Sequence, residues 1–71
     1  MDVEIRGEMI RLGQLLKMTD TVGSGGEAKA LLAEGGVRVN GEPEARRGRQ
    51  LHDGDVVEAL GRELRVVSPP G

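Results

Sequence analysis

The spacing of apolar residues changes at Gly35-Gly36 in this chain of 71 residues. From Leu12 to the glycine pair, apolar residues recur three and four positions apart, which is typical of amphipathic helices. After it, apolar and polar residues alternate, which is typical of half-buried strands. A helical half followed by a strand half predicts an α+β fold, in which a helix pair packs on a small twisted, mostly antiparallel sheet.

The first predicted helix lies between residues 12 and 18. Leu12, Leu15 and Leu16 have the spacing of one helical face, which predicts about two turns of helix. Gln14 and Lys17 would then point away from that face, into solvent. The polar residues that follow, 19–21, prefer caps and turns and end the helix.

The second predicted helix begins with a capping signal. Ser24 to Glu27 matches the pattern Ser-x-x-Glu, in which the serine caps the Glu27 amide and the glutamate reaches back. Gly35 is the expected left-handed residue at the end of this helix. The buried face would consist of Ala28, Leu31 and Leu32.

Short strands joined by tight turns are expected elsewhere. Val37 and Val39 flank Arg38, and Asn40-Gly41 is a strong hairpin signal. Asp53-Gly54 is a second turn signal. Further strands are predicted near residues 3–5, 56–57 and 63–67, with 42–50 as a loop or irregular edge and 68–71 as a frayed tail.

Composition limits the kinds of function. The length of the chain predicts a single domain over residues 1–71. We expect no cofactor or metal, because the chain has no cysteine and its one histidine is His52. There is no Phe, Tyr or Trp, so nothing can stack on the bases of a single strand. His52 adjoins Asp53, but neighbouring strand residues point to opposite sides, and no nucleophile with a supporting base is found. We therefore expect a protein that is not an enzyme.

Charge is distributed unevenly along the chain. The net charge is −2, which argues against indiscriminate coating of nucleic acid. Residues 38–49, however, carry four arginines against two glutamates, a local charge of +2, while both ends of the chain are acidic. The positive charge is therefore concentrated in the middle of the sequence.

Two segments could bind phosphate, and each has a simpler interpretation. Ser24-Gly25-Gly26 offers free amides at a helix start, although a plain capping box explains the same residues. Arg46-Arg47-Gly48-Arg49 could form a guanidinium clamp, or a solvated loop balanced by Glu42 and Glu44. We favour phosphate contact, because the order of helices and sheet could bring Lys17, Lys29 and the capped turn to the same face.

Taken together, these motifs resemble the S4 RNA-binding domain, and most closely its short stand-alone bacterial members. The resemblance is carried by Ser24-Gly25-Gly26-Glu27-Ala28-Lys29, by residues 35–41, by Arg46-Arg47-Gly48-Arg49 and by the Leu-x-Asp-Gly-Asp-Val-Val pattern at 51–57. It covers about residues 10–58. It implies a two-helix motif (the αL motif) whose exposed face, with nearby loop residues, binds structured RNA.

The resemblance also implies which residues contact RNA. The helical part of the face would be Lys17, Ser24, Gly25, Gly26 and Lys29, flanked by Arg38, Arg46, Arg47 and Arg49. The implied partners are ribosomal or transfer RNA, with ribosomal or RNA-processing proteins as further partners and no small-molecule substrate.

Two hypotheses follow for the function. The first is a cytoplasmic, non-catalytic protein that recognises RNA shape and backbone, since the chain lacks aromatic residues and any apolar run of membrane-spanning length. The alternative is a protein-interaction module of ribosome assembly or of an RNA-modifying complex, which would use the acidic strands in residues 53–67.

Overall fold

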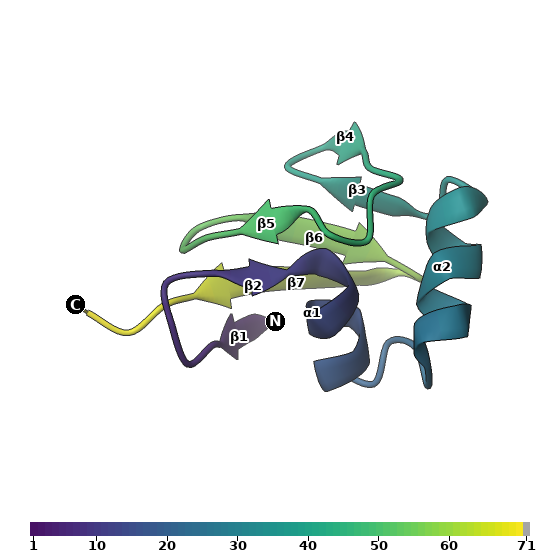
Figure 1. Cartoon of the computed structure of the whole chain (residues 1–71). Coiled ribbons are helices and arrows are strands. Elements are labelled where there is room, and N and C mark those ends of the chain that lie inside the picture. Colours follow the sequence, from purple (N-terminus) through teal and green to yellow (C-terminus); the bar gives the residue numbers. More distant parts are fainter. Residues whose placement is uncertain (71) are drawn as a thin grey trace.

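The computed structural model describes residues 1–70 and shows two layers built around one core (Figure 1). A five-stranded sheet with the order β1-β7-β6-β3-β4 forms one layer, and a two-stranded ribbon, β2-β5, belongs to the other. The elements are β1 (Asp2–Glu4), β2 (Ile10–Arg11), α1 (Leu12–Met18), α2 (Gly25–Ala33), β3 (Val37–Val39), β4 (Glu42–Pro43), β5 (Gln50–Leu51), β6 (Val56–Ala59) and β7 (Arg62–Val67). The α+β prediction is confirmed.

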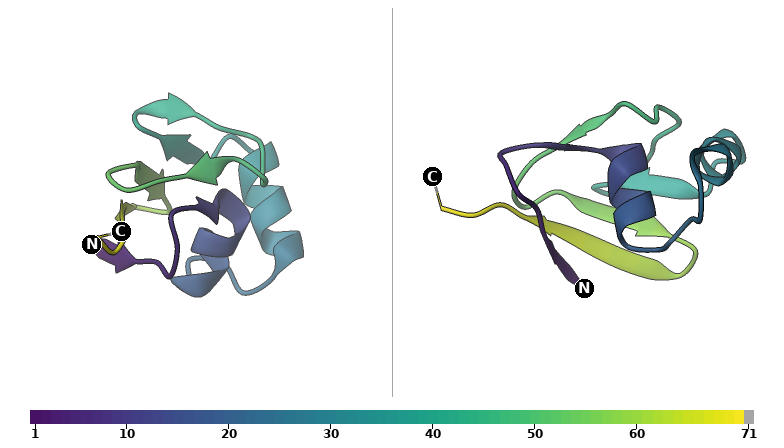
Figure 2. Two further views of the ribbon diagram at one scale, coloured as in Figure 1. Left: turned by 60° about the vertical axis from the view of Figure 1, so that its left-hand side comes forward. Right: turned by 60° about the horizontal axis from the view of Figure 1, so that its bottom comes forward.

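The helices lie on one side of the five-stranded sheet. Figure 2 shows α1 and the β2-β5 ribbon over one face, with α2 at the end of the sheet where β3 begins. Within residues 1–70 no helix lies on the other face. The layer between is filled by aliphatic side chains from every part of the chain, among them Val3, Leu16, Leu32, Val57 and Leu64.

Strand pairing is antiparallel except at one edge. The β3–β6, β6–β7 and β3–β4 pairs are antiparallel, whereas β1 runs parallel to β7 with Val3 opposite Val66. The first strand therefore pairs with the last. The amino group of Met1 donates to the carbonyl of Glu63 at 2.8 Å, which fixes the start of the chain to the same strand.

The first helix follows the predicted pattern. Leu12, Leu15 and Leu16 are fully buried, while Gln14 and Lys17 are exposed, as the spacing required. The helix ends at Thr19, whose hydroxyl donates to the carbonyl of Leu15 at 2.9 Å.

The second helix confirms one half of the predicted capping box and corrects the other half. The Ser24 hydroxyl accepts a hydrogen bond from the Glu27 amide at 3.2 Å. The Glu27 carboxylate, however, accepts from the amide of Gly23 at 2.7 Å and not from that of Ser24. It therefore reaches one residue further back than the capping-box pattern predicts. At the other end, Gly35 has a φ of +75° and terminates the helix as predicted.

The hairpin turns also form where they were expected. Asn40 and Gly41 have φ values of +51° and +83°, which is the geometry of a type I′ turn. The Asn40 side chain then bridges to the next strand: its amide donates to Asp55 at 3.1 Å, and its oxygen accepts from the Val56 amide at 2.9 Å. One turn residue thus links two hairpins.

The end of the chain is less free than predicted. Ser68 was expected to begin a frayed tail, but its amide donates to Asp53 at 2.9 Å and its hydroxyl donates to the carbonyl of Gly7 at 2.8 Å. Gly71 lies outside the described residues. Neither helix in the described part of the chain is long and apolar enough to cross a membrane.

Candidate nucleic-acid interface

The arginine-rich loop between β4 and β5 is docked on the start of α1 through its backbone. The amide of Leu12 donates to the carbonyl of Arg49, and the amide of Gly13 donates to the carbonyl of Arg47, each at 2.9 Å. These two amides belong to the first turn of α1 and would otherwise lack partners. The docking therefore satisfies the helix and fixes the loop, residues 44–49, against it.

The side chain of Arg47 crosses α1 and ends at the start of α2. Gly13 is buried, and a Cβ placed on it would collide with Cγ of Arg47, so the arginine stem lies directly on the helix backbone. One guanidinium nitrogen lies 3.9 Å from the position that a Cβ of Gly25 would occupy. Within residues 1–70 the Arg47 guanidinium makes no hydrogen bond or ion pair, so its donors face solvent beside the first turn of α2.

A surface hollow of about 450 Å³ lies at this point. Its lining comes from the end of β2, from α1, from the start of α2 and from the loop, and consists of Arg11, Gly13, Gln14, Lys17, Gly25, Ala28, Arg47 and Gly48. Segments that are far apart in the sequence thus bring three cationic side chains, those of Arg11, Lys17 and Arg47, to one depression. The structure confirms that Lys17, Gly25 and the arginine loop share a face.

Sequence reasoning missed Arg11. This residue occupies the N-cap position of α1, and its guanidinium donates to the carbonyl of Gly48 at 3.3 Å. A signal for it was present, because Arg11 precedes the exposed residues Gln14 and Lys17 at the same spacing of three, although it lies in β2 immediately before the helix. That spacing predicted the exposure of Gln14 and Lys17, and it extends by one step to Arg11.

Lys29 lies on the same side of α2 as Gly25, four residues earlier, and is exposed. Ser24 and Gly26, also named from the sequence, flank Gly25 at the helix start. The Ser24 hydroxyl is engaged with the Glu27 amide. The amides of Gly25 and Gly26 belong to the first turn and have no carbonyl partner within the helix.

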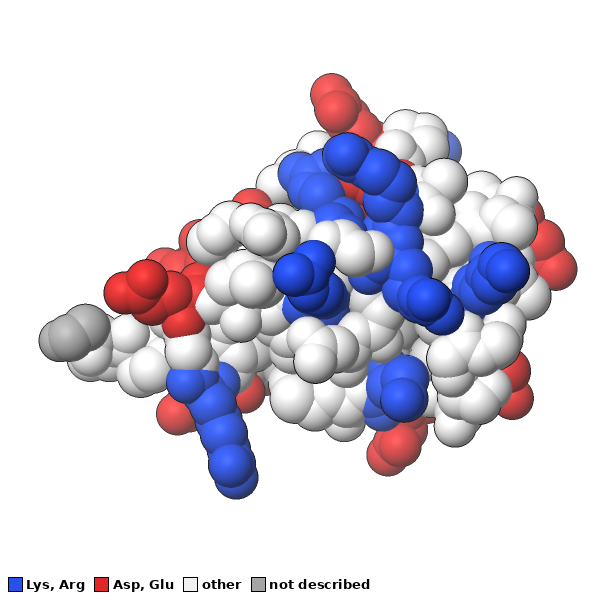
Figure 3. Space-filling view, in the orientation of Figure 1, with Lys and Arg blue, Asp and Glu red and all other residues white. Residues whose placement is uncertain are grey.

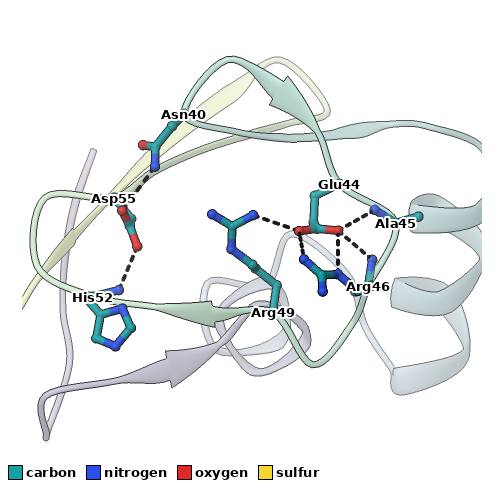
Figure 4. Close-up of polar contacts among 7 residues, drawn as sticks. All are labelled: Asn40, Glu44, Ala45, Arg46, Arg49, His52 and Asp55. Carbon is teal, nitrogen blue, oxygen red and sulfur yellow. Dashed lines mark hydrogen bonds and ion pairs between the residues drawn. The ribbon is translucent and has the colours of Figure 1, made fainter.

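The other two arginines of the loop are paired with one glutamate (Figure 4). Glu44 accepts from Arg49 at 2.8 Å and from Nε of Arg46 at 3.3 Å. The hydrogen bonds from Arg49 and then from Arg46 lower the pKa of Glu44 from 4.5 to about 2. Glu44 is therefore ionised at neutral pH and offsets part of the charge of the two arginines.

Beyond the loop, a second carboxylate organises the neighbouring turn. Burial raises the pKa of Asp55, but hydrogen bonds from the His52 amide at 2.8 Å and from Asn40 hold it below its usual value overall. His52 itself is exposed after β5, in the turn position predicted from the sequence. It contributes no acid–base pair with Asp53, whose carboxylate is bound to Ser68.

Viewed as a surface, the helix side of the molecule is basic at its centre. Figure 3 shows Lys and Arg side chains over α1, the loop and α2, with Asp and Glu side chains around the margin. We call the cations at the centre of this surface the basic face, and they are Arg11, Lys17, Lys29, Arg46, Arg47 and Arg49.

Arg38 does not join the basic face, although it was predicted to flank it. Its neighbours Val37 and Val39 are buried against the core, so alternation along β3 turns Arg38 to the helix-free side of the sheet. It lies opposite Glu58 of β6, and its guanidinium donates to the carbonyl of Gly41 at 3.3 Å.

The helix-free side of the sheet is predominantly acidic. The acidic side chains on it come from β1, β6 and β7 and are Asp2, Glu4, Glu58 and Glu63. The basic side chains on it come from β3 and β7 and are fewer, namely Arg38 and Arg65. The molecule therefore has a basic side and an acidic side, and its net charge of −2 conceals a locally basic surface.

Comparison with known proteins agrees with this geometry. The family model described as S4 domain matches residues 3–67, so the chain belongs to the S4 domain family. The match extends beyond the 10–58 segment that carried the sequence resemblance and reaches into β1 and β7, which pair in the sheet. A relative described as probable ribosome maturation protein RlbA, from Bacillus subtilis (strain 168), is 56% identical over 59 residues, which are 83% of each chain.

Proposed function

We propose that this protein binds structured RNA, ribosomal or transfer RNA, through the basic face and catalyses no reaction. The observation that carries the proposal is the convergence of Arg11, Lys17 and Arg47 on one hollow at the start of α2. Cations brought from three segments to one depression, with the donors of Arg47 unpaired within residues 1–70, form a surface suited to phosphate groups.

The chemistry of the hollow favours the RNA backbone over the bases. Arg47 can donate two parallel hydrogen bonds to one phosphate, and Lys17 adds a point charge nearby. The amides of Gly25 and Gly26 add donors at the positive end of a helix of nine residues. Because the chain has no Phe, Tyr or Trp, base stacking contributes little, and a folded RNA with ordered phosphates fits better than a flexible single strand.

The relative supports a ribosomal setting. RlbA is described as a probable ribosome maturation protein, and its similarity spans most of this chain. We propose that the RNA bound by this protein is ribosomal in the first instance, and that binding takes place in the cytoplasm during ribosome assembly, with ribosomal proteins as neighbours.

A second candidate function is attachment to another protein through the acidic side of the sheet. It is favoured by the excess of carboxylates there and by Leu60, a side chain that is 65% exposed at the tip of the β6–β7 hairpin. In that case the partner would be basic, and the basic face would be dispensable for association.

The test is binding of labelled ribosomal and transfer RNA across a salt series, with Arg47→Glu and Arg38→Glu compared. Both substitutions reverse one exposed arginine, but only Arg47 lies on the basic face. We expect about three to five phosphates to be neutralised, so that log affinity falls with log salt at a slope of roughly −2 to −4.

We expect Arg47→Glu to weaken RNA binding at least about tenfold and Arg38→Glu to change it by less than about twofold. Equal effects of the two substitutions, or an affinity independent of salt, would contradict the proposal. Association with ribosomal proteins that survives Arg47→Glu and is lost on changing Glu58 and Glu63 to lysine would favour the second candidate.

A further inference from the structure

Glu44 is an acidic residue within the basic face, and both of its carboxylate oxygens accept several hydrogen bonds. Its side chain is only 10% exposed. One carboxylate oxygen accepts from the amides of Ala45 and Arg46 at 3.0 and 3.1 Å and from Nε of Arg46 at 3.3 Å. The other accepts from Arg49 at 2.8 Å and from a terminal nitrogen of Arg46 at 3.4 Å.

These contacts fix the shape of the loop as well as its charges. The two backbone bonds turn the chain immediately after β4, and the amide of Arg49 closes the turn on the carbonyl of Arg46 at 3.2 Å. Arg46 and Arg49 are held toward Glu44. Arg47, between them in sequence, is left to cross α1 toward Gly25.

Glu44 nevertheless leaves donors free for a ligand. Arg46 bonds to it through Nε and one terminal nitrogen, and the Arg46 side chain is 76% exposed. Arg49 uses one terminal nitrogen. Both guanidinium groups can therefore contact a phosphate without leaving the carboxylate.

We infer that Glu44 is a positioning residue for RNA binding, which strengthens the affinity although its charge opposes that of the ligand. This inference rests on the proposed function. Three arginines on a free loop would lose side-chain freedom on binding RNA, whereas a loop already held in its binding shape loses less. Simple electrostatics gives the opposite expectation, namely that removing a carboxylate from a basic face strengthens RNA binding.

Glu42 provides a matched control. It is an exposed glutamate of β4, two residues away, and its side chain makes no hydrogen bond or ion pair within residues 1–70. Glu42→Gln and Glu44→Gln change the net charge equally, so any difference between them reflects the contacts of Glu44.

The experiment measures binding of labelled ribosomal RNA to the full chain and these variants across a salt series. We expect Glu44→Gln to weaken binding about three- to tenfold and to make the salt slope shallower by about one, because fewer arginines reach phosphates together. Glu42→Gln should leave affinity unchanged or slightly higher. Binding by Glu44→Gln that is as tight as that of Glu42→Gln, or tighter, overturns the inference.

Two further variants separate positioning from loss of fold. Glu44→Asp keeps the charge but shortens the reach, so it should also weaken binding, while Glu42→Asp should not. When Arg46 and Arg49 are both replaced by alanine, Glu44→Gln should have little further effect; an undiminished effect overturns the inference. If the unaltered protein binds no RNA, the proposed function fails together with the inference, whereas RNA binding that is insensitive to Glu44 refutes the inference alone.

Discussion

The ion pairs of Glu44 predict a specific dependence of stability on pH. Replacing Glu44 by glutamine removes a carboxylate whose pKa is lowered from 4.5 to about 2 in the folded chain, chiefly by its hydrogen bonds to Arg49 and Arg46. A carboxyl group with a lower pKa in the folded than in the unfolded state stabilises the fold when it is ionised. The substitution should therefore lower the free energy of unfolding at neutral pH.

The size of this loss can be bounded from the structure. One pKa unit corresponds to about 1.4 kcal/mol, so a fall from 4.5 to about 2 sets an upper limit of roughly 3.5 kcal/mol. Solvent screens part of it, since the Arg46 side chain is 76% exposed and that of Arg49 is 36% exposed. We expect Glu44→Gln to cost about 1–2 kcal/mol.

The pH window follows from the two pKa values. Above about pH 5 the contribution of Glu44 is complete, because its carboxylate is ionised in both states. It decreases as the pH falls from 4.5 toward 2, and near pH 2 the free energies of unfolding of the variant and the unaltered protein should converge.

The assay is urea unfolding followed by far-ultraviolet circular dichroism, since the chain has no tryptophan or tyrosine for fluorescence. Glu42→Gln is the control, and its free energy of unfolding should stay within about 0.5 kcal/mol of that of the unaltered protein. A difference between Glu44→Gln and the unaltered protein that is equal at pH 7 and pH 3 would refute the reasoning, as would no difference at pH 7.

Three further predictions concern the helix starts and the core. Gly13→Ala should displace the Arg47 side chain and reduce RNA affinity to that of Arg47→Ala. Alanine is favoured over glycine in a helix by about 1 kcal/mol, which limits any loss of stability. Unchanged RNA binding would contradict the contact between Arg47 and Gly13. Ser24→Ala should lower the free energy of unfolding in urea by about 1 kcal/mol, and no loss would mean that the cap is not formed. Leu64→Ala, at a fully buried position, should cost about 2–5 kcal/mol in the same assay, and a loss below about 1 would contradict tight packing there.

The local elements of this protein follow from short stretches of sequence. The leucine spacing of α1, the Ser24 cap and the Asn40-Gly41 turn each depend on residues within a few positions of one another, so their physical causes can be read without knowing the fold. The alternation that predicted β3 also predicts the side on which Arg38 lies, because a residue between two buried valines must face away from the helices. The resemblance to the family placed Arg38 with the other arginines. The alternation of side chains along β3 instead places it on the other side of the sheet from them.

Contacts between distant segments could not be predicted in this way. Nothing local to residues 2–4 indicates that β1 runs parallel to β7, because that pairing depends on how both ends of the chain pack over one core. Glu44 was considered as a counter-charge for the loop, but its hold on Arg49 requires the turn that its own backbone bonds create.

The sequence by itself therefore determined the helices, the turns, the α+β class and the presence of a basic segment in an acidic chain, since each of these depends on local spacing and composition. Only the tertiary structure decided that Arg11, Lys17 and Arg47 share one hollow, that Arg38 lies on the other side, and that Glu44 shapes the loop. The physical reason is that a binding surface forms where separate elements pack together, and their packing depends on the whole core.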